Sequence, residues 1–136
     1  MKTPSNPALN FAKRINAHDV EGLTELMTPD YTFIDSLGEK FTSPAIDEGW
    51  RQYFAMVPDY WIEVDRSFRF HDIAILIGRA GGTYVHPGGA MKPKNRWETP
   101  AVWVVRSRGR HVAEWRIYCD NEPIRLKMES RNDAHG

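Results

Sequence analysis

Two aspartates stand at the ends of stretches rich in aromatic and β-branched residues, where a carboxylate could act as a base. Asp35 closes YTFID and Asp120 closes RIYCD. A carboxylate held beside an apolar cavity can remove a proton from a carbon next to a carbonyl group. A turn role is the alternative for both, because Asp35 precedes Ser-Leu-Gly and Asp120 precedes Asn-Glu-Pro. Each residue is therefore a candidate catalytic acid or base and a candidate turn residue.

Aromatic residues are frequent in the same segments and would supply the wall of such a cavity. Tryptophans could stack on a flat ligand, and tyrosines or a histidine could donate hydrogen bonds to it. Packing in a core or at an interface is the competing role for the tryptophans in alternating strands. The candidate ligand-contacting residues in these segments are Tyr31, Phe33, Trp50, Tyr53, Phe54, Trp61, Tyr84, His86 and Trp115.

The remaining reactive residue types form no recognisable pattern. The five histidines are scattered without ligand spacing, and Cys119 is the single cysteine. Motifs for nucleophiles or for phosphate binding are missing too, so the sequence predicts no metal and no cofactor. The long connection over residues 85–98 contains three basic residues, and we weigh a lid over the ligand against a plain hairpin tip.

Composition restricts the class of protein. The chain has 136 residues, and its 18 basic and 18 acidic side chains cancel. This balance argues against nucleic acid or a membrane surface as a partner. No apolar run approaches the roughly 18 residues that span a bilayer. We expect a cytoplasmic protein with one domain over residues 1–128 and a polar, disordered tail over residues 129–136.

The candidate residues must be positioned by a helical first part and a stranded second part. Helix signals precede residues 7–16, 19–27 and 44–57, with proline or aspartate at each start. Alternating or apolar runs then predict strands. These strands are expected over residues 31–35, 60–70, 72–85, 98–108 and 110–120.

This order predicts an α+β fold. A single curved, mixed or antiparallel sheet with three N-terminal helices across its concave face buries both apolar surfaces. Glycines near the middle of residues 72–85 would supply the bend. The result is a cone-shaped α+β barrel with a cavity at its open end, and residues 31–35 lead Asp35 toward that end.

The segment FAKRINAHDVEGLTELMTPDYTFIDSLG resembles the opening of ketosteroid isomerase and its SnoaL-like, polyketide-cyclase relatives in the nuclear transport factor 2-like superfamily. The later segments TPAVWVV and HVAEWRIYCDNEP resemble the last two strands of SnoaL-like members. The resemblance extends over residues 7–127. It implies the cone fold, a deep apolar pocket for a small apolar or aromatic ligand, and a homodimer formed through the sheet.

The resemblance also implies roles for individual residues. Asp35 matches the proton-shuttling aspartate of the isomerase, and Asp120 lies where SnoaL-like members keep an acid. Phe11 and Val102 stand at the positions of the isomerase's two oxyanion donors, a tyrosine and a protonated acid. Each missing donor costs about 3–4 kcal/mol of transition-state stabilisation, so we exclude efficient steroid isomerisation. Phe11 and Val102 are instead expected to contact the ligand.

Two functions follow from these residues. One is a cofactor-independent isomerase or cyclase with Asp35 as its base, and the other is a non-catalytic ligand-binding or dimeric interaction protein with the same fold. Phe11 and Val102 favour the second function, whereas Asp35 together with Asp120 favours the first. Whether the protein is an enzyme is left open by the sequence.

Overall fold

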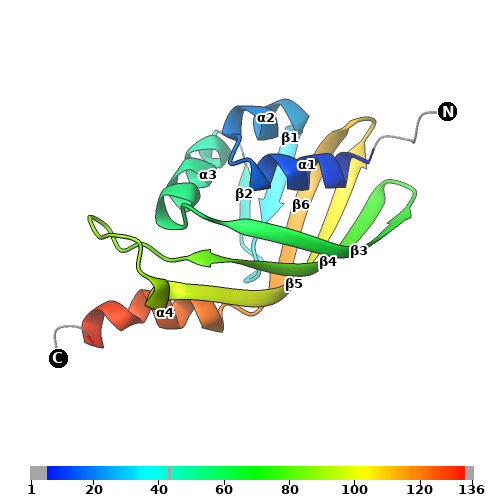
Figure 1. The fold of residues 1–136 in the computed structure, drawn as a ribbon. Coiled ribbons are helices and arrows are strands. Elements are labelled where there is room, and N and C mark those ends of the chain that lie inside the picture. Colours follow the sequence, from blue (N-terminus) through cyan, green and yellow to red (C-terminus); the bar gives the residue numbers. More distant parts are fainter. Residues whose placement is uncertain (1–5, 43, 134–136) are drawn as a thin grey trace.

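The structure, a computed structural model, describes residues 6–42 and 44–133. Within them helices precede and follow a set of strands, as Figure 1 shows. The elements are α1 (Pro7–Asn16), α2 (Val20–Leu26), β1 (Met27–Ile34), β2 (Lys40–Thr42), α3 (Ala45–Met56), β3 (Trp61–Phe70), β4 (Ile73–Thr83), the 3₁₀ helix η1 (Pro93–Asn95), β5 (Arg96–Arg108), β6 (His111–Cys119) and α4 (Glu122–Asp133).

The first two helices begin at the residues that the sequence indicates. The Asn6 side chain accepts a hydrogen bond from the Leu9 N–H at 3.3 Å, and Pro7 occupies the first helical position. Asp19 caps α2 by accepting from the Gly22 N–H at 2.9 Å. His18 between them has a φ of 54°, so the predicted turn is confirmed.

The strands form one six-stranded sheet in the order β2-β1-β6-β5-β4-β3. β1 runs parallel to β6, whereas all other neighbours are antiparallel. The predicted α+β architecture with a mixed sheet is thereby confirmed. The parallel pair brings the end of β1 and the end of β6 to the same edge of the sheet.

A bulge bends the sheet beside a glycine, as predicted. The β3–β4 register shifts between Val64 and Arg66, opposite Gly78. A Cβ atom at Gly78 would lie 1.7 Å from the backbone oxygen of Glu63, so only glycine fits here. The bulge increases the local twist and curvature of the strands.

The N-terminal helices cover one face of this curved sheet (Figure 1). Helix α1 places Phe11 and Ile15 against the strands, where both are essentially inaccessible to solvent. Trp103 from β5 and Trp115 from β6 are buried in the same core and belong to its sheet side. The core therefore lies between α1 and the centre of the sheet. The cavity lies beside this core and shares Trp103 and Trp115 with it.

Three features depart from the expected elements. Strand β1 begins at Met27, and β2 and α4 were not predicted. Helix α4 continues to Asp133, through the first part of the segment expected to be a polar tail. Residues 134–136 lie outside the described residues. No helix in the described part of the chain has the length and apolarity to cross a lipid bilayer.

Candidate active site

A cavity of about 350 Å³ opens between α3, the sheet and the start of α4. This volume is within the range of roughly 300–1,000 Å³ that small-molecule sites occupy. The wall is largely aromatic and aliphatic, and its polar groups gather at one part of the rim. The lining residues are Phe33, Asp35, Ser36, Phe41, Ala45, Ile46, Gly49, Trp50, Tyr53, Tyr60, Ala80, Trp97, Thr99, Trp103, Trp115, Ile117, Cys119, Asp120, Asn121 and Ile124.

Strand periodicity explains which side chains reach this cavity. Successive strand residues point to opposite faces, so residues two apart share a face. Strand β6 accordingly contributes Trp115, Ile117 and Cys119. The same alternation in β1 runs from Phe33 to Asp35, just past the end of the strand. Asp35 therefore faces the same side as Phe33 because of its position in the pattern.

Helix α3 closes the opposite wall. Ile46, Gly49, Trp50 and Tyr53 lie three or four residues apart and share one face of the helix. The Trp50 ring packs edge-on against Phe11, with ring centroids 6.4 Å apart. Since Phe11 is fully buried, this contact ties the cavity wall to the core.

The Asp35 carboxylate is held by the turn that follows it. Its Oδ1 accepts hydrogen bonds from the backbone N–H groups of Leu37 and Glu39, both at 2.9 Å. Every hydrogen bond recorded for this carboxylate in the described part of the chain ends on Oδ1. The predicted turn role is thus confirmed, and the same residue lines the cavity. The two roles are compatible because the turn hydrogen bonds end on Oδ1 and do not engage Oδ2.

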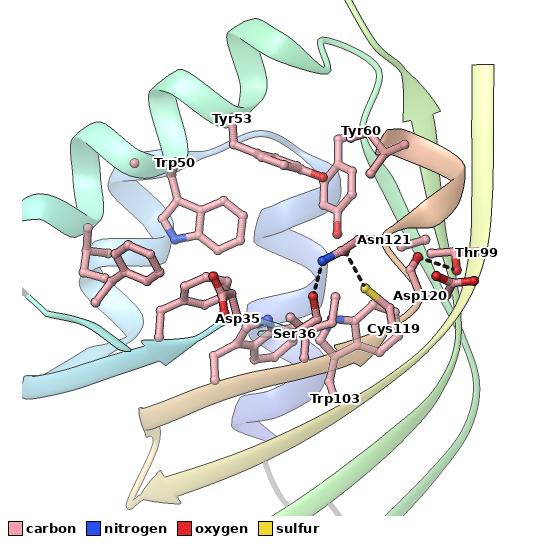
Figure 2. A pocket seen from close by; sticks show the side chains of 18 of the residues that line it. Asp35, Ser36, Trp50, Tyr53, Tyr60, Thr99, Trp103, Cys119, Asp120 and Asn121 are labelled. Atoms are coloured by element: carbon pink, nitrogen blue, oxygen red, sulfur yellow. Dashed lines mark hydrogen bonds between the residues drawn. The ribbon is translucent and has the colours of Figure 1, made fainter. Parts of the chain in front are cut away.

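The second acid sits on a neighbouring turn. Asp120 Oδ1 accepts from the Glu122 N–H at 2.9 Å, at the start of α4. The adjacent Asn121 amide donates to the Ser36 hydroxyl at 2.5 Å, which links this turn to the one after β1 (Figure 2). Asp35 and Asp120 are therefore both at the rim, on turns that are bonded to each other.

Two tyrosines also line the cavity. Tyr53 from α3 and Tyr60 before β3 meet edge to face, with ring centroids 4.9 Å apart (Figure 2). Burial raises the pKa of Tyr60 well above its usual value, and the neighbouring Tyr53 and Cys119 raise it further. Burial likewise raises the pKa of Tyr53. Both phenols are consequently neutral hydrogen-bond donors at physiological pH.

Cys119 lies between the rim and these tyrosines. Its Sγ is 3.5 Å from the Asn121 Oδ1. Burial raises the pKa of this thiol. It is therefore a protonated, weakly nucleophilic group at neutral pH.

The structure brings six of the predicted site residues to the cavity. They are Asp35, Asp120, Phe33, Trp50, Tyr53 and Trp115. The other seven do not line it, and their expected contact with a ligand is corrected. They are Phe11, Tyr31, Phe54, Trp61, Tyr84, His86 and Val102.

Core packing accounts for Phe11 and Tyr31. Phe11 packs behind the cavity wall, with its ring centroid 4.7 Å from that of Trp115. Tyr31 stacks on Phe11 at 5.8 Å, and its hydroxyl is buried without a hydrogen-bond partner among the described residues. Both residues therefore support the wall without forming it.

Val102 and Trp61 lie on the wrong face of the sheet. Val102 stands between Ala101 and Trp103, which are buried beneath the helices, so its side chain points to the opposite face. A displacement of one residue in a strand always reverses the face. Trp61 precedes the buried Ile62 and packs over Gly81 on that same outer face.

The remaining three residues are engaged elsewhere. Phe54 stacks on His18, with ring centroids 4.2 Å apart. Tyr84 meets His86 edge to face at 4.7 Å, in the connection that follows β4. Within the segment 85–98 that we considered as a lid, Trp97 lines the cavity from β5, whereas the part before β5 contributes no residue to it.

Most lining residues from the later strands were not predicted. Alternation along β5 would have found Trp97, Thr99 and Trp103, since all three share the face of the buried Ala101. Ser36, Asn121 and Ile124 carry no such signal because they belong to turns and to the unpredicted α4. Tyr60 does carry the signal, because it lies two residues before the buried Ile62 in the segment 60–70 that was expected to be a strand, although β3 begins at Trp61. The described residues contain no group of three or more histidine, cysteine or acidic side chains arranged to hold a metal.

Comparison with protein families matches residues 8–119 to the SnoaL-like domain. A search of curated proteins gives no significant match. Among solved structures, a protein with a ketosteroid isomerase-like fold from Catenulispora acidiphila, in complex with trimethylamine, aligns with a TM-score of 0.78 and 17% identity, over 92% of this chain and 93% of that one.

Two further solved structures are similar to a comparable extent. A protein proposed to be a SnoaL-like polyketide cyclase, from Shewanella denitrificans, gives a TM-score of 0.76 at 16% identity, over 91% of this chain and 95% of that one. AclR from Streptomyces galilaeus, proposed to be a hydroxylase, gives a TM-score of 0.74 at 17% identity, over 91% of this chain and 93% of that one. At these identities the likeness concerns the fold.

Proposed function

The chain belongs to the family of SnoaL-like domains, and on that premise we propose that it is a small-molecule enzyme in which Asp35 acts as general base. Its substrate is a flat, apolar molecule with a carbonyl group, similar to a polyketide. The reaction is an isomerisation or a ring closure that needs no cofactor.

One observation carries this proposal. Asp35 lines an aromatic cavity while two backbone N–H groups hold its Oδ1. These bonds fix the carboxylate without help from a mobile side chain, and they do not engage Oδ2. A fixed base beside an apolar cavity is the arrangement that general-base catalysis requires.

The proposed chemistry balances without a further reactant. Asp35 takes a proton from the carbon next to the carbonyl, and the electron pair of the broken C–H bond moves onto the carbonyl oxygen. If the enolate is conjugated with a C=C bond, it can take the proton back at the far end of that conjugated system, which shifts the double bond. Otherwise its carbon attacks a second carbonyl of the same molecule. In the second case the new C–C bond closes a ring, and the proton ends on the alkoxide oxygen. Asp35 gives this proton to the alkoxide, and Asp120 at the same rim is the second candidate acid or base of the site.

The apolar character of Phe11 and Val102 narrows the substrate class. Neither position supplies a hydrogen-bond donor, and neither side chain lines the cavity. A substrate whose carbon acid is weak would depend on strong donors at the forming oxyanion. We infer a substrate that needs fewer donors, because its anion is delocalised over neighbouring carbonyl groups.

The experiment uses 2-tetralone, a flat bicyclic ketone whose benzylic C1 protons are acidic. In D₂O, NMR measures the rate at which these protons are replaced by deuterium. The wild-type protein is expected to accelerate the exchange, and Asp35→Asn is expected to reduce that acceleration by about 10²-fold or more. Asp65→Asn, on the exposed part of β3, is the matched control and should retain it. Retention by Asp35→Asn would exclude Asp35 as the base.

A non-catalytic ligand-binding protein is the second candidate. The absence of donors at Phe11 and Val102 favours it, because binding needs no oxyanion stabilisation. In that case 2-tetralone would quench the fluorescence of the cavity tryptophans without any acceleration of exchange. Fluorescence and exchange measured on the same samples therefore separate the two functions.

We further propose that the protein is a homodimer that associates through the open sheet face, defined as Phe68, Ile75, Val102, Val104, Arg116 and Tyr118. Phe68, Ile75, Val104 and Arg116 follow one another across four adjacent strands. Phe68 and Tyr118 are about half exposed, and the buried Nε of Arg116 has no partner among the described residues. A second copy would cover this apolar row.

A further inference from the structure

Two hydroxyl groups in the cavity lack internal partners. Among the described residues, no hydrogen bond joins the Tyr53 or Tyr60 hydroxyl to another group, although the Tyr60 side chain is only 7% exposed. In the described part of the chain, the side-chain polar atoms that are inaccessible to solvent and have no hydrogen-bond partner are Tyr31 OH, Trp97 Nε1 and Arg116 Nε. The hydroxyls of Tyr53 and Tyr60 are not among these, so they contact the open space of the cavity that both residues line.

The directions of the two hydroxyl groups can be followed in Figure 2. The Tyr60 hydroxyl is directed toward Asn121, and the Tyr53 hydroxyl ends beside the Tyr60 ring. Asn121 itself is engaged with Ser36 and Cys119. A hydroxyl that reaches the cavity and has no internal partner is available to donate a hydrogen bond to a ligand oxygen.

We propose that Tyr53 and Tyr60 form a donor pair that binds one acceptor oxygen of the ligand, a carbonyl or an enolate oxygen. This inference rests on the proposed function and deepens it, because it assigns the oxygen of the ketone to one part of the cavity. The two donors come from α3 and from the residue before β3, and they replace the donors that Phe11 and Val102 do not supply.

The electrostatic environment fits an acceptor that is neutral or gains negative charge during the reaction. Both phenols are neutral donors, and the nearby Cys119 thiol is also protonated. The two carboxylates lie on the rim turns, and Figure 2 shows the Tyr60 hydroxyl directed toward Asn121 and not toward either carboxylate. A ligand with its oxygen at Tyr60 thus has its ring system between the tryptophans and Asp35.

The test compares two ligands that differ by one oxygen. 2-Tetralone has the oxygen, and tetralin has the same two rings without it. Tryptophan fluorescence gives the dissociation constant of each ligand for the wild type, Tyr53→Phe, Tyr60→Phe and the double variant. We expect Tyr60→Phe to weaken 2-tetralone about three- to tenfold while tetralin changes less than twofold. Equal effects on the two ligands, or none, would overturn the donor pair.

A matched control is available in Tyr31. Its hydroxyl is also buried without a partner, but it lies in the core and does not line the cavity. Tyr31→Phe should therefore leave the affinity for both ligands unchanged. A selective loss of 2-tetralone binding in this variant would contradict the proposal, because it would place the oxygen elsewhere.

A second measurement needs no variant. The carbonyl carbon of ¹³C-labelled 2-tetralone should move downfield on binding to the wild-type protein, as hydrogen-bonded carbonyls do. A bound resonance at the position found in an apolar solvent would refute the donor pair even if the tyrosine variants fold poorly.

The role of Asp35 as the base and the donor pair of Tyr53 and Tyr60 can be disproved independently of each other. If Asp35→Asn leaves hydrogen exchange intact while Tyr60→Phe abolishes the preference for the ketone, the base is wrong and the donor pair stands. If Asp35→Asn abolishes exchange but neither tyrosine variant alters the preference, the base stands and the donor pair is wrong.

Discussion

The Asn121 amide donates a hydrogen bond to the Ser36 hydroxyl at 2.5 Å, and this bond joins two turns that are 85 residues apart in the sequence. One turn carries Asp35 and the other carries Asp120. The bond thus keeps both carboxylates at one rim of the cavity.

Asn121→Ala should loosen this rim. We expect the free energy of unfolding to fall by about 0.5–1 kcal/mol, the typical contribution of one hydrogen bond. Urea denaturation measures the loss. Ser36→Ala and the double variant complete the cycle, and the double variant should be little worse than either single one. Strictly additive losses would mean that the two side chains do not interact.

Asp35→Ala and Asp35→Asn should differ in stability. Asparagine keeps an Oδ1 that can accept from the Leu37 and Glu39 N–H groups, whereas alanine leaves both without their acceptor. We expect alanine to cost about 1–2 kcal/mol in urea denaturation and asparagine to cost much less. Equal costs would show that charge, and not the turn geometry, determines the contribution of Asp35.

Cys119 should react slowly with maleimides at neutral pH. Burial raises the pKa of its thiol, so the thiolate fraction stays low and the labelling rate should still be rising at pH 9. As the single cysteine, it can be followed by mass spectrometry without interference. A cavity ligand such as tetralin should slow the reaction. Urea-unfolded protein is the control, and labelling of the folded protein at the same rate would contradict the burial.

Asp30 should titrate far below an ordinary aspartate. Hydrogen bonds from the Arg108 guanidinium, and then from the Thr28 hydroxyl, lower the pKa of Asp30 from 3.8 to about 2. A carboxyl with a lowered pKa in the folded state contributes stability above the unfolded value and loses it as the pH falls from about 4 to 2. Carboxyl ¹³C NMR should find this low pKa, and Arg108→Met should raise it toward 3.8. An unchanged value in the variant would exclude the ion pair as its cause.

The proposed dimer should dissociate when a charge enters the open sheet face. Ile75 lies in the centre of the row across the strands and is 38% exposed. Ile75→Arg would place an additional cation near Arg116, so light scattering should change from a dimer to a monomer. Met91→Arg, in the connection before η1 and also exposed, is the control and should remain dimeric. A monomeric wild type would refute the dimer directly.

Sequence patterns predicted the elements better than the cavity wall. Pro7, Asp19 and Pro58 mark helix boundaries by local chemistry, and these boundaries are confirmed. The cavity wall depends on which face a strand residue takes, and an error of one residue at Val102 reversed that face. Asn121 lies in a turn, where no periodic pattern exists to place it, whereas Tyr60 shares the alternation of the strand expected over residues 60–70.

The resemblance predicted the scaffold correctly, and Asp35 lies at the cavity as expected. The end of a strand is fixed by the sheet, so the position of a residue there follows from the fold, whereas the role of Asp35 as a base stays a proposal. Phe11 shows the opposite case, because a tyrosine replaced by phenylalanine has no hydroxyl and becomes part of the core. Local substitution, and not a change of fold, separates this site from that of the isomerase.

The parallel pairing of β1 with β6 also determines the reach that a ligand needs to contact both carboxylates. Ile34 is opposite Arg116, so Asp35 lies level with Ile117 and Asp120 lies three residues further along. At about 3.3 Å per residue this offset is roughly 10 Å along the strands. Lengthening either turn would leave the offset almost unchanged, whereas a two-residue slip between the strands would alter it by about 7 Å. Redesign of this protein for larger or smaller molecules should therefore begin with the alignment of these two strands.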